Sequence, residues 1–328
     1  MCLPRPAIVL PDPGACTALP TDYAPCLDDM YPECVSDNGE YVRVEETIST
    51  IARVEGYERM ADLIFDPMTE PTMDDFLMAR LIYQEDEGLD SRVVRRYDPH
   101  FDVPDGTDCT ADGTPAMFPD YCVGPALIQP IILDAFMLGV AGTEPSRQAG
   151  RIDGALLWFL YASTYKESLT CTTKAKDCDS AFAYYTGGRL NREGIGLAGH
   201  VRELDPYAHD RAWDGLLAVR CWRDLDPGET AQDLALRERA RTQYDRAVLD
   251  GVAAVVIDRF ERLATATGAS QAYYWGFLQA LGPALDRGLA EADMAAATTV
   301  QTELAKTDPS TVDTAGAIAA IQGVFTCP

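Results

Sequence analysis

Residues Ser146 to Leu169 read SRQAGRIDGALLWFLYASTYKESL and give the strongest indication of fold class. Their central part, Ala155 to Ala162, contains no charged residue and would be apolar on every side of a helix. A helix without a polar face must be surrounded by other helices, because its surface otherwise meets water. The sequence therefore predicts a buried helix at the centre of an all-α helical bundle.

Helical periodicity also dominates the rest of the chain after about residue 39. Thr72 is expected to cap a helix with an acidic first turn, and Asp205, followed by Pro206, is expected to cap another. Runs of alternating β-branched residues are few, so no sheet is expected. The expected helices span residues 45–65, 72 onward, 125–140 with a kink near Pro130, 146–169, 205–225, 229–266, 270–290 and 311–325.

Two helical hairpins suggest an internal repeat. Asp134 precedes the sequence ALLWFL, which contains Trp158, and Asp250 precedes AYYWGFL, which contains Trp275. A duplication of this kind would give two pseudo-symmetric bundles. The alanine-rich composition that such helices share explains the likeness as well, so both interpretations stay open.

Composition divides the chain into an arm and a helical domain. Residues 1–39 are rich in proline, aspartate and cysteine without sustained periodicity, which predicts an irregular arm held by disulfides. Residues 40–328 form the expected helical domain, with candidate halves at 40–204 and 205–328.

The charge balance limits the classes of partner. The chain has 328 residues, and 27 lysines and arginines against 52 aspartates and glutamates give a formal net charge of −25. A nucleic-acid-binding surface needs clustered positive charge, so no nucleic-acid partner is expected. No apolar run approaches the ~20 residues that span a bilayer, so no transmembrane segment is expected.

The ten cysteines predict an oxidising compartment. None lies in a C-x-x-C motif, which disfavours zinc ribbons and thioredoxin-like redox pairs. Cys109 with Cys122, and Cys171 with Cys178, each bracket a short loop, so we expect these two pairs to form disulfides. Reduced, buried cysteines that act as small hydrophobic residues are the alternative.

The first residues bear on localisation. Met1-Cys2-Leu3-Pro4 lacks the basic start and the apolar run of a signal peptide, which suggests that an export signal has been removed. Cys2 stands where the lipidated cysteine of a mature bacterial lipoprotein would lie, so we predict a lipid anchor there. An unmodified Cys2 is the alternative.

The motif H-x-x-E at His200 and Glu203 is a candidate transition-metal site. On a helix these two side chains face the same way and could ligate iron, copper or zinc, with Asp205, His209 and Asp210 as further ligands. In the alternative interpretation, His200 caps a short helix and Glu203 pairs with an arginine.

A second candidate metal site lies in the aspartate-rich loop of residues 98–112. Asp102, Asp105, Asp108 and Asp112 continue a spacing of three to four residues that begins at Asp98. Oxygen ligands of this kind suit calcium, so we predict a calcium site there, although the EF-hand pattern is missing. An ordinary turn-rich loop is the alternative.

No common catalytic motif is present, so an enzyme is not favoured. The signatures H-E-x-x-H, G-x-S-x-G and G-x-x-x-x-G-K-[ST] are absent, and no E-x-x-H of a di-iron site occurs. Polar residues on otherwise apolar helices either form structural ion pairs or line a ligand site with Tyr161 and Tyr165. These polar residues are Asp134, Arg151, Asp153, Lys166, Glu167, Asp214, Arg220 and Arg223.

Three features of the chain resemble the imelysin superfamily of exported bacterial helical proteins. They are the duplicated hairpin, the H-x-x-E motif at His200 and Glu203, and the sequence KDCDSAFAYYTGG of residues 176–188, which is similar to a W-x-E-A-F-x-Y-x-G element. The family motif is G-x-H-x-x-E, whereas here Ala198 occupies the glycine position. The resemblance implies two helical bundles, a location in the periplasm or at the outer membrane, and a link to iron uptake.

Together these patterns predict an exported or lipid-anchored bacterial protein that binds a metal ion or a small ligand. The main alternative is a non-catalytic structural or interaction component of the cell surface whose N-terminal arm contacts a partner protein. A third interpretation is an enzyme with carboxylates in a bundle cavity lined by Asp153, Glu167 and Tyr165.

Overall fold

The computed structural model describes residues 41–45, 48–85 and 88–325. Within these residues every regular element is a helix and no β-strand occurs, which confirms the all-α prediction. The predicted arm at residues 1–39, including the lipid anchor at Cys2, lies outside the described residues.

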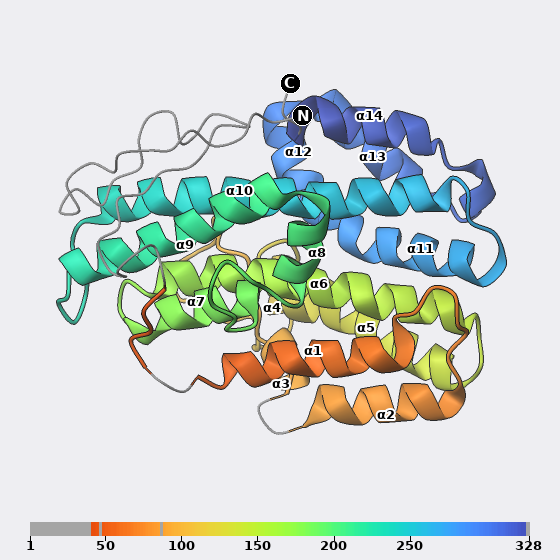
Figure 1. Ribbon diagram of the computed structural model, residues 1–328, viewed down its shortest axis with the longest axis horizontal. Coiled ribbons are helices and arrows are strands. Elements are labelled where there is room, and N and C mark those ends of the chain that lie inside the picture. Colours follow the sequence, from red (N-terminus) through yellow and green to blue (C-terminus); the bar gives the residue numbers. More distant parts are fainter. Residues whose placement is uncertain (1–40, 46–47, 86–87, 326–328) are drawn as a thin grey trace. The chain divides into compact units, whose positions relative to one another are not determined.

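Among the described helices, α6 (Pro145–Thr170) and α10 (Leu234–Leu263) are the longest (Figure 1). Three short elements depart from α geometry: the π-helix η3 (Gly124–Ile128) and the 3-10 helices η4 (Gly282–Leu285) and η5 (Pro309–Thr311). The other helices are α1 (Thr50–Ile64), α2 (Met73–Gln84), α3 (Asp90–Val93), α4 (Thr114–Met117), α5 (Gln129–Val140), α7 (Lys176–Thr186), α8 (Leu197–Leu204), α9 (Pro206–Leu225), α11 (Gly268–Leu281), α12 (Asp286–Ala292), α13 (Met294–Leu304) and α14 (Thr314–Phe325).

The chain divides into two compact units. Of the described residues, unit 1 comprises those between 41 and 51, residues 163–254 and Phe325, and unit 2 comprises those between 52 and 162 and residues 255–324. The division falls inside α6 and α10, not between residues 204 and 205, because each of these long helices contributes one end to each unit. The two-fold symmetry of two bundles stays a prediction.

Unit 1 is built around large aromatic side chains on α7 and α9. Phe182 packs edge-on against Trp213 with ring centroids 5.3 Å apart, and Tyr185 stacks on His209 at 5.8 Å. Trp213 and Trp222 are both buried. These tryptophans therefore belong to the core, as their helical positions indicate.

A buried carboxylate on α7 anchors the start of the described chain to unit 1. Asp179 accepts hydrogen bonds from the Tyr41 hydroxyl at 3.0 Å and from the backbone amides of Val44 and Glu45 at 2.8 and 2.9 Å. The Tyr41 ring also stacks on Phe182 at 4.0 Å. Burial raises the pKa of Asp179, and the hydrogen bonds from these three donors oppose that rise.

In unit 2, three glycines bring the backbones of α6 and α11 into contact. A Cβ atom at Gly150 would lie 2.0 Å from the carbonyl oxygen of Tyr273, and one at Gly154 would lie 2.5 Å from that of Phe277. From the other side, a Cβ at Gly276 would lie 2.2 Å from a carbonyl oxygen of α6. Only glycine fits at these positions, because any side chain would overlap a backbone carbonyl.

The same helix crossing buries a carboxylate beside two tyrosines. Asp153 is 2% exposed and accepts hydrogen bonds from the hydroxyls of Tyr57 at 2.7 Å and Tyr273 at 2.5 Å. Just beyond it, all residues of Ala155–Ala162 are buried, which confirms the predicted central helix. Asp153 is therefore a hydrogen-bonded core residue, and its two tyrosine partners lie on α1 and α11.

Two helix starts agree with their predicted caps, and two long segments are interrupted. Thr72 and Asp75 form a capping box at α2, and the Asp205 side chain caps α9. The irregularity expected near Pro130 takes the form of the π-helix η3, and α5 follows it. The single helix expected over residues 270–290 is broken at Pro283, which lacks the backbone N–H that would continue it.

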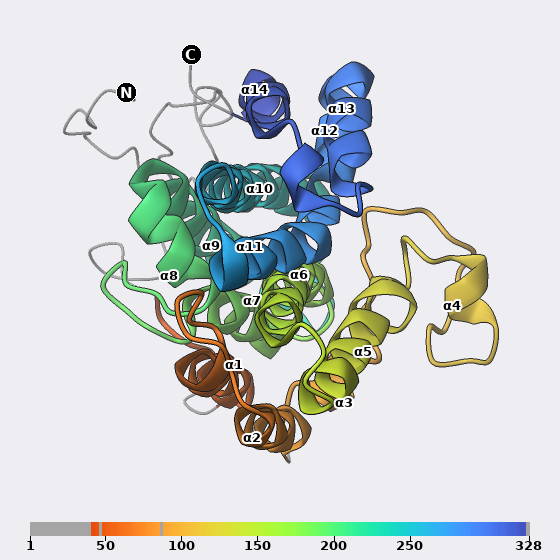
Figure 2. The ribbon, with the colours of Figure 1, turned by 90° about the vertical axis from the view of Figure 1, so that its right-hand side faces the viewer.

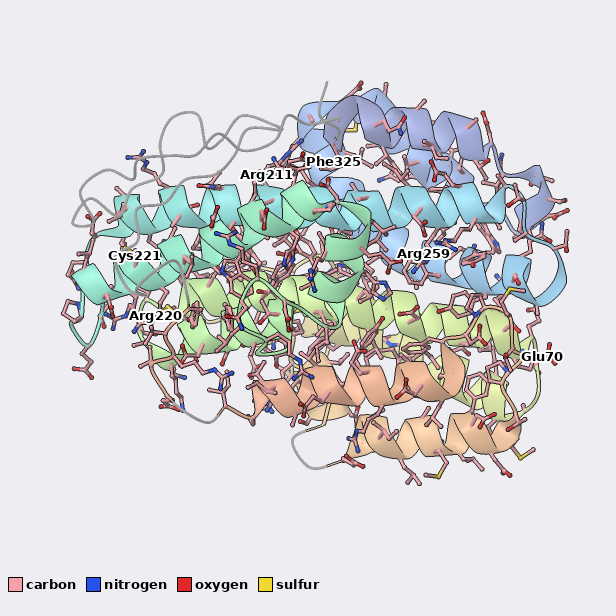
Figure 3. All side chains as sticks on the ribbon, in the orientation of Figure 1. Glu70, Arg211, Arg220, Cys221, Arg259 and Phe325 are labelled. Atoms are coloured by element: carbon pink, nitrogen blue, oxygen red, sulfur yellow. A yellow bond between two sulfur atoms is a disulfide. The ribbon has the colours of Figure 1, made fainter. Side chains whose placement is uncertain are left out.

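Both predicted disulfides are present. Cys109 bonds to Cys122 in unit 2, and Cys171 bonds to Cys178 in unit 1, with Cα atoms 5.3 and 5.1 Å apart. Cys221 on α9, labelled in Figure 3, is also disulfide-bonded, and its partner lies outside the described residues. No described cysteine is a free thiol, so the alternative of reduced cysteines is not supported.

The α6–α11 contact predicts opposite effects for two glycine-to-alanine substitutions. Gly150→Ala should lower the free energy of unfolding by about 3 kcal/mol, because its methyl group overlaps a backbone carbonyl that cannot move alone. Gly323→Ala on α14 is the matched control, since its Cβ meets open space, and it should raise stability by about 0.5 kcal/mol. Chemical denaturation measures both; equal effects would contradict the proposed contact.

Candidate functional site

A cavity of about 90 Å³ lies within unit 2 and is the candidate functional site. Its walls come from the loop before η3, from α6, and from the segment where η4 joins α12. Figure 2 shows the loop that contains α4 next to α5, and it shows α12 next to α13. The lining residues are Asp98, Phe101, Asp120, Val123, Leu127, Trp158, Tyr161, Pro283, Ala284, Asp286 and Arg287.

The loop of residues 98–123 is held so that its two ends reach the cavity. The Asp98 amide donates to the carbonyl oxygen of Tyr121 at 2.7 Å, which closes the loop at its base. The disulfide between Cys109 and Cys122 ties the middle of the loop to the same base. Asp98 and Asp120 are consequently brought to one cavity although they lie at opposite ends of the loop.

The carboxyl of Asp286, in the wall of the cavity, has a raised pKa of about 6. Burial is the main cause of this rise, a hydrogen bond with Gln301 opposes it, and the Asp120 carboxylate adds a smaller rise. Its Oδ1 atom is buried and has no hydrogen-bond partner among the described residues. An unpaired buried carboxylate oxygen costs free energy in the folded protein.

Arg287 is the one cationic side chain among the lining residues, and its guanidinium group is already hydrogen-bonded to other residues. The Arg287 guanidinium donates to the Tyr161 hydroxyl at 3.1 Å and to the Glu291 carboxylate at 3.0 Å. Asp98 in turn contacts the His100 Nδ1 atom at 2.6 Å. Three carboxylates against one engaged guanidinium give the cavity an acidic character.

The predicted transition-metal ligands His200 and Glu203 lie on one helix, and no third candidate ligand is grouped with them among the described residues. His200 and Glu203 are both on α8, half-buried and exposed respectively. The three further candidates are used otherwise: Asp205 caps α9, both ring nitrogens of buried His209 have hydrogen-bond partners, and Asp210 pairs with an arginine at 3.4 Å. Within the described ranges, no three His, Cys, Asp or Glu residues are placed to hold a metal ion.

The predicted calcium ligands lie on the surface of the loop. Asp102, Asp105, Asp108 and Asp112 are exposed, and Asp108 accepts hydrogen bonds from the amide and the hydroxyl of Thr110 at 2.9 and 2.7 Å. That turn is what the alternative interpretation expected. In the part of the chain that the structure describes, these aspartates form no three-residue cluster, so calcium binding stays a prediction without geometric support.

Most polar residues predicted on apolar helices form ion pairs within one unit. Tyr161 does line a cavity, as the ligand-site interpretation expected, whereas Tyr165 lies against the Arg241 guanidinium at 4.5 Å. Asp153 and Glu167 belong to different units and share no described site. The ion pairs are Asp134–Arg151, Lys166–Glu167, Arg192–Asp214 and Arg220–Asp224.

Sequence reasoning missed Asp120 and Asp286 as site residues. Asp120 stands outside the regular aspartate spacing, and Asp286 lies in a segment that was expected to be one continuous helix. The only signal for Asp286 was Gly282-Pro283, because a proline inside a helical pattern marks a break. Trp158 was expected in the core, and it lines the cavity while being 7% exposed.

Comparison of the chain with protein-family models, with curated proteins and with solved structures found no match. The resemblance to the imelysin superfamily therefore stays a prediction. Across the described residues, no helix has both the length and the apolar character that crossing a membrane requires.

The raised pKa of Asp286 predicts that Asp286→Asn stabilises the ligand-free protein above pH 6. A carboxyl whose pKa is raised by folding adds stability at low pH and loses it as pH rises through the folded-state value, here about 6. The asparagine variant should be more stable by about 1 kcal/mol at pH 7.5, allowing for solvent screening of this half-buried group. This advantage should vanish near pH 4.

Thermal unfolding of the variant and the wild type between pH 4 and pH 8 measures this difference. Asp112→Asn, at an exposed position in the loop of residues 98–123, is the control and should show no such pH-dependent gain. A variant less stable than the wild type at every pH would mean that Asp286 is a structural anchor.

Proposed function

We propose that this chain is an exported binding protein that holds part of a small ligand in the cavity of unit 2. The cavity carries the proposal, since apolar walls with a few converging polar groups are typical of ligand sites. Trp158 and Tyr161 supply rigid aromatic surface, and Asp98, Asp120 and Asp286 supply carboxylates. A ligand would pair with these carboxylates and cover the aromatic walls.

The volume of the cavity limits the size of the ligand group that it can hold. An engineered cavity of about 150 Å³ holds benzene, so one of about 90 Å³ takes a smaller group. The cavity therefore fits the head of a ligand whose remaining part lies outside it. The residues that line it are acidic, aromatic or aliphatic, with Arg287 the one basic group among those described, and no nucleophilic hydroxyl or thiol of Ser, Thr or Cys is among them. This composition favours binding over covalent catalysis.

Export is supported by cysteine chemistry. Disulfides form and persist in oxidising compartments, and every described cysteine is disulfide-bonded. The resemblance to exported bacterial proteins in the sequence points the same way. A structural role at the cell surface is the competing function, and it predicts no ligand in the cavity.

Filling the cavity tests the proposed function. Small fragments of four to six carbons with ammonium, guanidinium, hydroxyl or carboxylate heads are titrated into the protein and followed by calorimetry. At least one should bind with one-to-one stoichiometry, and Ala284→Met should weaken it at least tenfold, because the new side chain occupies the cavity. Ala305→Met, at an exposed site, should leave binding unchanged.

Two outcomes would contradict the proposed function. One is that no fragment of any class binds to the folded wild-type protein. The other is that Ala284→Met, shown to be folded by its unfolding transition, binds every fragment as the wild type does. In that second case the fragments bind elsewhere.

The proposal of export predicts that the stability of the protein depends on its disulfides. Replacing both Cys171 and Cys178 by alanine should lower the free energy of unfolding by about 2.5 kcal/mol, on the entropy of the short loop that they close. Denaturation in the presence of a reductant should lower the stability of the wild type by at least as much. Equal stability with and without reductant would argue against a protein suited to an oxidising compartment.

A further inference from the structure

The cavity has the chemistry of a site for an organic cation. We infer that its ligand carries a primary ammonium or guanidinium head, bound between the carboxylates of Asp120 and Asp286 and the ring of Trp158. This inference rests on the proposed function and names the ligand class of the same site. Three separate properties of the lining residues support it.

The first property is charge. Asp98, Asp120 and Asp286 contribute three carboxylates, whereas Arg287 contributes one guanidinium that Glu291 and Tyr161 already engage. An anionic head would meet three like charges, while a cationic head would relieve the repulsion between Asp120 and Asp286 that raises the Asp286 pKa. The charge balance therefore favours a cation.

The second property is the aromatic wall. Phe101, Trp158 and Tyr161 all line the cavity, and a cation over an aromatic face is attracted by the electrons of the ring. Trp is the best of the three rings for this interaction. The carboxylates and the aromatic rings that line the cavity therefore both attract a cation.

The third property is the supply of hydrogen-bond acceptors. The ionised carboxylates of Asp98, Asp120 and Asp286 in the cavity wall accept hydrogen bonds, and an ammonium or guanidinium group carries only donors. Either head would donate to these carboxylates without adding an acceptor that needs a partner. The cavity volume suits a head of this size and excludes an aromatic ring.

Because Asp286 titrates, the affinity of the cavity for a cation should depend on pH. A carboxyl with a pKa of about 6 is mostly neutral at pH 5, so the affinity for a cation should fall about tenfold between pH 7.5 and pH 5. His100 beside Asp98 is a second source of pH dependence, so the Asp286→Asn variant must be measured across the same range. The charged and titratable groups around the cavity are Asp98, His100, Asp120, Tyr161, Asp286, Arg287 and Glu291.

The test compares three probes of the same chain length: n-butylamine, n-butanol and n-butyrate, with agmatine as the guanidinium probe. Calorimetry at pH 7.5 should show binding of n-butylamine or agmatine at least tenfold tighter than of n-butanol, and no binding of n-butyrate. Asp286→Asn should weaken the cation at least tenfold and remove most of its pH dependence. Asp120→Asn should weaken it about threefold, and Asp112→Asn should leave it unchanged.

Separate outcomes overturn the inference and the proposed function. If n-butanol or n-butyrate binds best and Ala284→Met abolishes that binding, the cavity is a ligand site but not one for cations. If calcium chloride binds and Asp286→Asn abolishes that binding while amines do not bind, the site takes a metal ion instead. Loss of stability in Asp286→Asn is checked by its unfolding transition, and Asp120→Asn, at an exposed residue, keeps the test valid in either case.

Discussion

The close contact between α6 and α11 is the constraint on which the rest of unit 2 depends. Gly150 and Gly154 on α6, and Gly276 on α11, remove the side chains that would hold the two backbones apart. At this distance Asp153 reaches the Tyr273 hydroxyl, so a buried carboxylate is satisfied at the crossing itself. The helix pair is thus fixed by both shape and hydrogen bonding, and sliding of one helix along the other would break both.

The position of the cavity follows from the contact between α6 and α11. Trp158 and Tyr161 lie one to two turns beyond Gly154 along α6, and α11 ends at Gly282-Pro283, where the chain turns into η4 and α12. That turn places Asp286 and Arg287 against the same part of α6. The aspartate-rich loop supplies the remaining wall.

The fold could be predicted from the sequence further than the site could. A helix that is apolar on every side, such as Ala155–Ala162, leaves one solution, and the capping residue Thr72 marks a boundary by local chemistry alone. The site depends on pairs that are distant in the chain, such as Asp120 with Asp286, and no local pattern reports these. The regular spacing from Asp102 to Asp112 led to the prediction of a calcium site, but exposed turns produce the same spacing.

Buried carboxylates in this protein differ in how they are satisfied, and this difference identifies the site. Asp179 accepts three hydrogen bonds, and Asp250 pairs with Arg211 and Arg246 at 2.9 Å, although burial raises the pKa of Asp250 to about 6 as well. A raised pKa alone therefore does not mark a binding site. Asp286 combines it with a position in the wall of a cavity, and its Oδ1 atom has no hydrogen-bond partner among the described residues. An unpaired buried carboxylate oxygen costs free energy, and perturbed groups of this kind cluster at functional sites.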